Sequence, residues 1–154
     1  MAFFIFRRKE TMMFRVREAV VRYKTISSPI RSIGRPADVY DFFKSMVEGE
    51  TRENFYCLYL DIKNKVICFE KIAMGTSTAV NIDPKEIIRT GLLVGAERLI
   101  LAHNHPSGDS TPSPEDGSLT IKVGQISNMF NMELLDHVVV GDGQFTSLKE
   151  RGIL

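Results

Sequence analysis

Two histidines separated by one residue, His103 and His105, open a loop rich in Pro, Ser and Gly, and Asp116 follows eleven positions after the second histidine. Two imidazole nitrogens and a carboxylate oxygen can bind zinc and leave a fourth tetrahedral position for water, as catalytic zinc sites do. Residues i and i+2 of an extended segment point to the same side, so both imidazoles can face one point. The spacing predicts a metal site; a polar loop with two chance histidines is the alternative.

The segments on either side of the loop are expected to position these side chains. Residues 99–102 predict a short apolar strand that leads into His103 at its carboxyl end, where ligand sites of α/β proteins gather. Residues 113–116 are typical of a helix start, with Ser113 as N-cap and Pro114 at the first helical position. The helix that follows is expected to bury an apolar face made of Leu119, Val123, Ile126 and Phe130.

The first half of the chain predicts a strand, a helix and a hairpin. Residues 14–26 are rich in β-branched side chains, which favour a strand. Residues 36–48 predict a helix that opens at a proline, and residues 55–76 predict a hairpin whose polar tip is 61–65. The apolar positions of the helix are Val39, Phe42, Phe43, Met46 and Val47.

A second helix is expected over residues 83–98, with Asp83 as N-cap and Glu86 completing a box-like pair. Residues 134–141 predict a further strand, and Phe145 is expected to begin a short final one. Strands that alternate with helices, together with one hairpin, imply helices packed on a mixed sheet. The predicted fold class is an α/β three-layer sandwich.

The composition is that of one soluble domain. The chain has 154 residues, of which 44% are hydrophobic and 25% charged, values ordinary for a globular protein. No apolar run approaches the roughly 20 residues that span a bilayer. The opening ten residues place apolar side chains before basic ones, the reverse of a secretory signal. We therefore expect a cytoplasmic protein with no membrane partner.

The two cysteines exclude other zinc chemistries. Cys57 and Cys68 lie eleven positions apart, without C-x-x-C spacing. We expect buried strand residues and no disulfide. A zinc site made of cysteines is excluded, and so is the H-x-E…P-C-x-x-C signature of zinc deaminases.

Positive charge is concentrated at the N-terminus. Residues 1–35 carry nine Lys or Arg against two Glu, a net charge of +7, whereas the remaining 119 residues have a net charge of −6. A basic arm of this kind can contact the phosphates of DNA or an acidic partner. A solvated strand with an irregular terminus is the alternative.

The full pattern around the histidines resembles the JAB/JAMM metallopeptidase signature, a distal Glu followed by H-x-H-x7-S-x2-D. The HNHPSGDSTPS segment makes it most similar to the RadC-like branch. The segments FYCLYLDIKNKVI, GTSTAV, DPKEIIRTGL, ERLILAHNHPSG, SPED and LLDHVVVG also follow the order of the family, so the resemblance covers roughly residues 28–150. It implies a JAB1/MPN-like fold of cytidine-deaminase-like topology. The chain then divides into a basic arm and first strand (1–27) and a metal-binding domain (28–154).

The resemblance assigns roles to five positions. It makes His103, His105 and Asp116 the ligands of Zn²⁺, which lowers the pKa of a bound water towards ~7. Glu70 becomes the general base that passes the proton to the leaving amine, and Ser113 donates to the oxyanion. These roles imply a zinc-dependent amide hydrolase, a peptidase or isopeptidase that acts on a peptide or protein substrate.

Each assignment has an alternative. Glu70 stands in an otherwise apolar strand, where a carboxylate needs a partner; pairing with Lys71 in solvent is the other reading, and Glu86 and Glu97 are rival bases. Ser113 can instead serve only as the helix N-cap. The remaining histidine, His137, is either a buried structural residue or, with Asp136 beside it, a group that orients a metal ligand.

Two departures from the family pattern limit the function. Asn104 stands between the histidines, where deubiquitinating members have Ser or Thr, which argues against a ubiquitin substrate. We also expect no N-terminal helix-hairpin-helix segment of the kind found in longer RadC-like proteins, which leaves the basic arm as the expected contact with DNA. The alternative functions are those of a DNA-repair-associated protein and of a non-catalytic scaffold. Iron and manganese are alternative metals. The sequence does not indicate the oligomeric state.

Overall fold

A mixed five-stranded sheet forms the centre of the molecule in the computed structural model, which describes residues 15–75 and 82–154. The strands lie in the order β2-β1-β3-β4-β5. Strands β3 and β4 are parallel, and the three other pairs are antiparallel. Their bounds are β1 Glu53–Leu60, β2 Val66–Gly75, β3 Arg98–Asn104, β4 Glu133–Val140 and β5 Phe145–Ser147.

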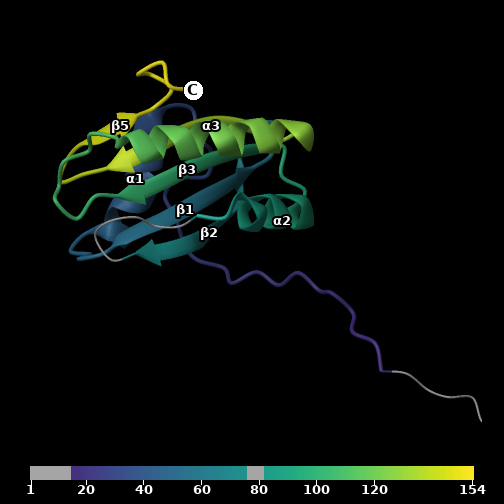
Figure 1. Ribbon diagram of the computed structural model, residues 1–154. Helices are drawn as coiled ribbons and strands as arrows, with labels where there is room; N and C mark the ends of the chain where they lie inside the picture. Colours follow the sequence, from purple (N-terminus) through teal and green to yellow (C-terminus); the bar gives the residue numbers. More distant parts are fainter. Residues whose placement is uncertain (1–14, 76–81) are drawn as a thin grey trace, which may run out of the picture.

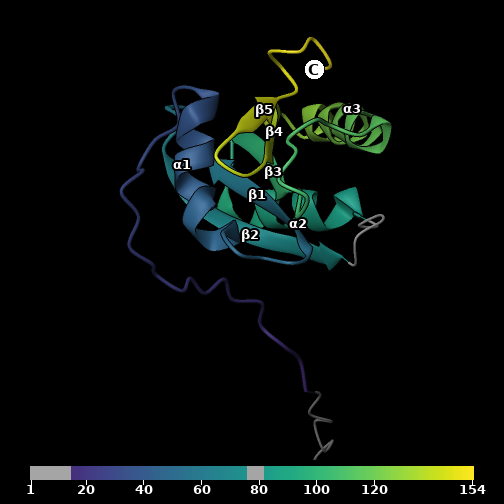
Figure 2. The same cartoon turned by 90° about the vertical axis from the view of Figure 1, so that its left-hand side faces the viewer.

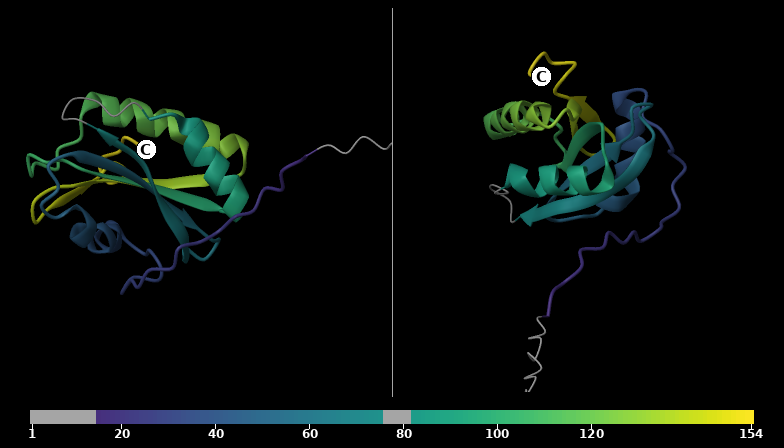
Figure 3. Two further views of the ribbon diagram at one scale, coloured as in Figure 1. Left: turned by 90° about the horizontal axis from the view of Figure 1, so that it is seen from below. Right: turned by 90° about the vertical axis from the view of Figure 1, so that its right-hand side faces the viewer.

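Three helices cover the two faces of the sheet. Helix α1 (Pro36–Val47) lies on one face, and α2 (Pro84–Val94) and α3 (Pro114–Met129) lie on the other (Figures 1 and 2). The view from below shows the three layers edge-on (Figure 3). Each interface buries its own apolar cluster, one around Phe43 of α1 and one around Ile87 of α2. The predicted three-layer α/β sandwich is therefore confirmed.

The strand expected over residues 14–26 is absent from residues 15–26, the part of it that the structure describes. These residues are exposed and have no regular secondary structure, and Val16 is 90% exposed. β-Branched residues favour strands only where a pleated, half-buried surface receives them. The first attachment to the sheet is a bridge between Ser32 and Lys65, next to buried Ile33. Residues 15–27 thus extend from the body of the domain (Figure 1).

Helix α2 is shorter than the sequence indicates. It ends at Val94 because Gly95 adopts the left-handed conformation with φ of 68°, which glycine tolerates as a helix C-cap. Arg98, expected as the end of this helix, is the first residue of β3. At the other end the N-cap Asp83 accepts a hydrogen bond from the Lys85 amide at 2.9 Å, as expected, but Glu86 forms no capping box and pairs with Arg89 instead.

The buried face of α3 also differs from the expected apolar one. Val123 is buried, and Leu119 and Ile126 are partly buried against the same cluster. Phe130 is 46% exposed, because the helix ends at Met129 and the phenylalanine is its C-cap. Small and polar residues fill the rest of this face: Thr120, Gly124 and Ser127 are buried. Hydrophobic periodicity could not find these three positions.

Two other expectations concern the cysteines and the membrane. Cys57 is buried in β1, Cys68 is partly buried in β2, and both are free. Within residues 15–75 and 82–154, no helix has the length and apolar character needed to cross a membrane. The expected loose terminus over residues 1–12 and most of the GTSTAV segment lie outside the described residues.

Candidate metal centre

The side chains of His103, His105 and Asp116 converge where β3 ends and α3 begins. The Nε2 atoms of the two histidines are 3.0 Å apart. Asp116 Oδ1 lies 3.3 Å from Nε2 of His103, and Oδ2 lies 3.7 Å from Nε2 of His105. One ligand atom from each residue falls within 4.8 Å of the others. The structure therefore brings together the three residues that the motif singled out.

A capping box at the start of α3 fixes the carboxylate. The Ser113 amide donates to Asp116 Oδ2 at 2.7 Å, and the Asp116 amide donates to Ser113 Oγ at 3.1 Å. Reciprocal bonds of this kind satisfy free amides of the first helical turn. Ser113 takes the N-cap role that was its alternative. It does so through the lone pair of its oxygen, so the hydroxyl proton remains free to donate to another acceptor.

A chain of buried hydrogen bonds fixes the tautomer of His103. Thr120 Oγ1 lies 2.6 Å from the Asp116 carbonyl oxygen and 2.6 Å from Nδ1 of His137. The carbonyl can only accept, so the hydroxyl proton goes to it and His137 Nδ1–H must donate to the hydroxyl. Nε2 of His137 then accepts from Nδ1–H of His103 at 2.8 Å. In neutral His103 the lone pair is therefore on Nε2, facing His105 and Asp116.

His105 has the same tautomer for a different reason. Its Nδ1 lies 2.7 Å from the carbonyl oxygen of Asp109, which can only accept, so Nδ1 carries the proton. The loop is held in place by bonds from the His105 amide to the Val140 carbonyl at 3.0 Å and from the Gly108 amide to the His105 carbonyl at 2.9 Å. The Nε2 lone pair of His105 thus also points into the cluster.

Two lone pairs and a carboxylate therefore face one another, an arrangement that requires a cation. A tetrahedral zinc at about 2.1 Å from two nitrogens holds them roughly 3.4 Å apart, and 3.0 Å between the Nε2 atoms is near that spacing. Second-sphere partners on the outer ring nitrogens are typical of histidine ligands of metals. The donor set and its supporting bonds both fit a zinc ion.

The pKa values follow from the same contacts. Burial disfavours the charged form of Asp116, but His103 and His105, which donate to its carboxylate when their Nε2 atoms are protonated, outweigh burial and lower its pKa. The hydrogen bond to Asp116 raises the pKa of His105. Burial, with the neighbouring His103 ring, lowers the pKa of His137 well below its usual value. His137 is therefore neutral, as its place in the hydrogen-bond chain requires.

Packing and hydrogen bonds surround the histidines. The ring of Phe55, opposite His103 in the β1–β3 register, stacks on it with a centroid distance of 5.7 Å. Asn104, between the two histidines, points the other way: its Oδ1 accepts from the Asn54 amide at 2.7 Å, and its Nδ2 donates to the Arg52 carbonyl at 3.0 Å. Both bonds tie the end of β3 to the start of β1.

Glu70 lies outside the three-residue group. It is on β2, opposite Cys57, whereas His103 is opposite Phe55, so the two side chains are on one face of the sheet, separated by β1. Its carboxylate contacts the Tyr59 hydroxyl at 3.3 Å. The alternative pairing with Lys71 is not present, since the Lys71 ammonium lies over the Tyr56 ring. The rivals Glu86 and Glu97 are not in the group either.

His137 has features of both alternatives. Its ring is fully buried, as in a structural residue, and it also contacts the candidate ligand His103. Asp136 does not take part, because its carboxylate accepts from the His137 amide, Ser147 and the Lys149 amide. Sequence reasoning missed Thr120. Its position, four residues after Asp116 on one helix face, is a signal that could have revealed it. The Asp109 carbonyl could not be found, since a main-chain group has no sequence signature.

A cleft lies beside the cluster and is lined by His105 but not by His103 or Asp116. Its volume is about 890 Å³, and its walls are the end of α1, the 48–51 connection, the 104–108 loop and the 140–143 turn. Glycines allow the last two to approach each other closely: a Cβ on Gly141 would lie 2.3 Å from the Gly108 carbonyl oxygen.

The comparisons with known proteins identify the family to which the domain is similar. The family model of the RadC-like JAB domain matches residues 33–153. The UPF0758 protein of Halalkalibacterium halodurans is 43% identical over 122 residues, which is 79% of this chain and 53% of the relative. UPF0758 proteins of Symbiobacterium thermophilum (40% over 130 residues, 83% and 56%) and Methanosarcina mazei (35% over 129 residues, 84% and 56%) are also similar.

The chain spans about half the length of the curated relatives that it matches. The family match covers the sheet, all three helices and each residue of the candidate metal centre. The chain therefore belongs to the RadC-like JAB domain family.

Proposed function

We propose that this domain is a zinc-dependent hydrolase of amide bonds, acting as a peptidase or isopeptidase. The observation that carries the proposal is the convergence of His103 Nε2, His105 Nε2 and the Asp116 carboxylate, each side chain being held by a further hydrogen bond. When bound there, zinc supplies the Lewis acidity that makes water nucleophilic near neutral pH. The neighbouring cleft of about 890 Å³ has room for a peptide segment.

The residues around the cluster supply the remaining chemistry. Glu70 receives the proton lost by the attacking water at its carboxylate and returns it to the leaving amine. The Tyr59 hydroxyl, 3.3 Å away, orients that carboxylate. The free hydroxyl proton of Ser113 donates to the oxyanion of the tetrahedral intermediate, a contribution of about 3 kcal/mol in comparable sites. The capping box leaves this proton available.

A substrate screen with a matched pair of variants tests the proposal. Zinc-loaded protein is incubated with fluorogenic peptides and with isopeptide-linked lysine substrates. We expect turnover that Glu70→Gln abolishes, while Glu115→Gln, an exposed carboxylate beside Asp116, retains it. Equal rates for the two variants, or no turnover across the panel, would contradict a Glu70-dependent hydrolase. Repeating the assay with Fe²⁺ and Mn²⁺ identifies the active metal, since the same donor set suits both.

A second candidate function is contact with DNA through the basic N-terminal arm. The observation that favours it is the exposure of residues 15–27, whose Arg15, Arg17, Arg22 and Lys24 form no ion pair within the described residues. Binding through phosphates falls steeply with salt. We expect the protein to bind a labelled duplex at low salt, and we expect this binding to be lost on deletion of residues 1–27. Salt-independent binding, or binding by the deleted chain, would rule out the arm.

A further inference from the structure

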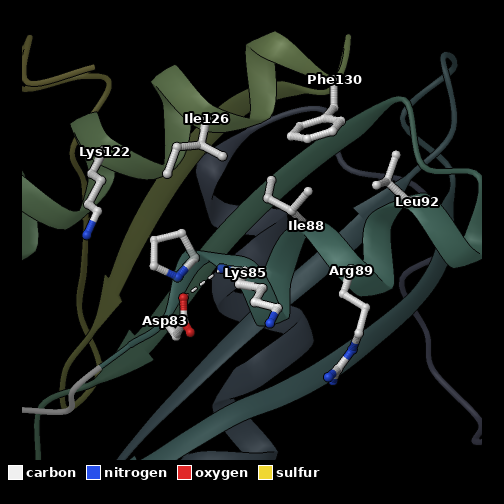
Figure 4. Close-up of a pocket in the computed structure, with 9 residues that line it drawn as sticks. Asp83, Lys85, Ile88, Arg89, Leu92, Lys122, Ile126 and Phe130 are labelled. Carbon is white, nitrogen blue, oxygen red and sulfur yellow. Dashed lines mark hydrogen bonds between the residues drawn. The ribbon is translucent and has the colours of Figure 1, made fainter.

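A groove on the helical face of the molecule, between α2 and α3, is distinct from the candidate metal centre. Its volume is about 530 Å³, and none of the three clustered residues lines it (Figure 4). Ile88, 6% exposed, lies within it, with partly buried Ile126 across from it. Leu92 and Phe130 line the groove and are 53% and 46% exposed. Contiguous accessible apolar side chains rimmed by polar ones mark interaction surfaces.

The charged residues of the groove are mostly basic. Lys85, Arg89 and Lys122 line it, against one carboxylate, Asp83. Asp83 is the N-cap of α2 and accepts from the Lys85 amide at 2.9 Å, so its charge is directed at the helix end. Arg89 pairs with Glu86, whereas Lys85 and Lys122 have no ion-pair partner in the part of the chain that the structure describes.

The two lysines and the exposed apolar side chains are separated along the groove. Figure 4 shows Lys122 and Asp83 towards one end and Leu92 and Phe130 at the other, with Lys85 between them. Arg89, which pairs with Glu86, lies on the side of Leu92. A ligand that complements the groove therefore carries apolar side chains at one end and negative charge at the other.

Charge excludes two occupants that the chain itself could supply. A second copy joined by a two-fold axis would place the same patch opposite itself, and hence one mostly basic surface against another. The segment 15–35 has exposed apolar residues such as Val16 and Val20, but it also carries six Lys or Arg against one Glu. Like charges brought together across an interface cost free energy. An occupant with carboxylates is favoured by the same argument.

We propose that the α2–α3 groove is a docking site for a segment of another protein that carries two large apolar side chains followed by acidic residues. The apolar pair contacts Ile88, Leu92 and Phe130, and the carboxylates face Lys85 and Lys122. Apolar anchors one helical turn apart are how peptides occupy grooves between helices. This docking does not depend on a bound metal and is separate from hydrolysis.

Peptide selection with charge and apolar variants tests the proposal. A phage library of random dodecapeptides is selected on the full-length protein, and enriched sequences are synthesised with a fluorescent label for anisotropy titrations. We expect enrichment of peptides with Leu or Phe pairs and Asp or Glu. Their affinity should fall about tenfold in Leu92→Ser and in Lys122→Glu, decrease with salt, and be equal with and without zinc.

The chain offers matched controls. Leu93, the next residue of α2, is 56% exposed but does not line the groove, and Lys63 is exposed on the hairpin tip. Leu93→Ser and Lys63→Glu should leave the affinity unchanged. The proposal is overturned if nothing is enriched, if the enriched peptides have no excess of acidic residues, or if the control variants weaken binding as much as the groove variants. Sedimentation velocity tests self-association. Self-association that Leu92→Ser abolishes would overturn the proposal and show that a second copy of the chain occupies the groove.

Discussion

At the scale of single residues, hydrogen bonds fix which ring nitrogen of each clustered histidine carries the proton. His137 and the Asp109 carbonyl contact the outer ring nitrogens of His103 and His105, and Thr120 contacts His137 in turn. Each directs a proton away from the cluster, so both Nε2 atoms present lone pairs to Asp116. The candidate metal ligands are thus oriented by groups outside the ligand set.

Replacing Thr120 by Val tests this preparation, because the two side chains have nearly the same shape. We expect zinc affinity to fall 10- to 100-fold, as it does when second-sphere partners of metal ligands are removed. Leaving His137 Nδ1–H without an acceptor should also lower the free energy of unfolding by about 1–3 kcal/mol. Competition with a zinc chelator measures the affinity. Ser118→Ala, which removes an exposed hydroxyl of the same helix, is the control; an equal effect in both variants would contradict the account.

The sequence predicted the clustered trio but not its supports. His103, His105 and Asp116 form a fixed pattern in the sequence, and their convergence follows from one strand, one loop and one helix start. Thr120 lies on α3 and His137 on β4, so their contact depends on the packing of α3 on the sheet. The contact of His137 with His103 depends on the pairing of β3 with β4. That pairing is a property of the sheet and has no local signal.

At the scale of elements, short local motifs set where the helices begin. Asp38, in the first turn of α1, accepts from the amides of Gly34 at 2.8 Å and Arg35 at 3.0 Å. Ser113 and Asp116 do the same for α3, and there the cap also fixes the carboxylate of the cluster. The same motif therefore stabilises the start of α1 and, at the start of α3, also positions a residue of the candidate metal centre.

Asp38→Asn should reduce the free energy of unfolding by about 1 kcal/mol at neutral pH. The hydrogen bond from the Gly34 amide lowers the pKa of Asp38 in the folded protein. A depressed folded pKa gives stability that is present above the unfolded value of about 3.9 and lost as the pH falls through the folded value. The difference between wild type and variant in urea unfolding should thus be constant from about pH 5 to 7 and shrink below about pH 4.

Asp41→Asn is the control for this experiment. Asp41 pairs with exposed Lys44 on the same helix at 2.7 Å, and such surface pairs contribute less than about 0.5 kcal/mol. A variant–wild-type difference at Asp38 that grows on acidification would show that its charged form does not stabilise the helix.

Gly141→Ala should disrupt the loop that holds His105. A Cβ at this position would lie 2.3 Å from the Gly108 carbonyl oxygen, which also accepts from the Asp142 amide at 2.9 Å. We expect a loss of at least about 1 kcal/mol in the free energy of unfolding together with weaker zinc binding. Gly34→Ala, where a Cβ meets only ordinary contact at 3.5 Å, should change zinc binding little. Unchanged zinc affinity in Gly141→Ala would show that the loop does not position His105.

Element types were predictable, whereas some boundaries were not. The hairpin and α1 follow from alternating and helical apolar spacing, and both are present. The expected end of α2 failed because apolar spacing continues past Gly95, whose left-handed backbone ends the helix. The prediction of a strand over 14–26 was wrong for the described residues 15–26, because β-propensity carries no information on whether a neighbouring strand is available.

At the scale of the whole molecule, the candidate sites lie in the same folded domain as the two apolar clusters. The first residue that packs against these clusters is Ile30, and residues 15–27 lie outside them. The candidate metal centre, the cleft at His105 and the α2–α3 groove all belong to the folded domain.

Deleting residues 1–27 should leave thermal stability unchanged, because the described part of this segment, residues 15–27, is exposed and outside both apolar clusters. Differential scanning calorimetry of the two chains measures the melting temperature directly. A fall of several degrees would correspond to about 1 kcal/mol in a domain of this size and would mean that the arm packs on the domain.

The most direct test of the account is the zinc content of the purified protein, measured by inductively coupled plasma mass spectrometry after zinc loading and dialysis. We predict about one zinc per chain, lost in His103→Ala and Asp116→Ala and retained in Asp142→Asn, an exposed carboxylate of the neighbouring turn. Failure of the wild-type chain to retain zinc, or equal zinc in the wild type and the two ligand variants, would contradict the metal centre and with it the proposed hydrolase.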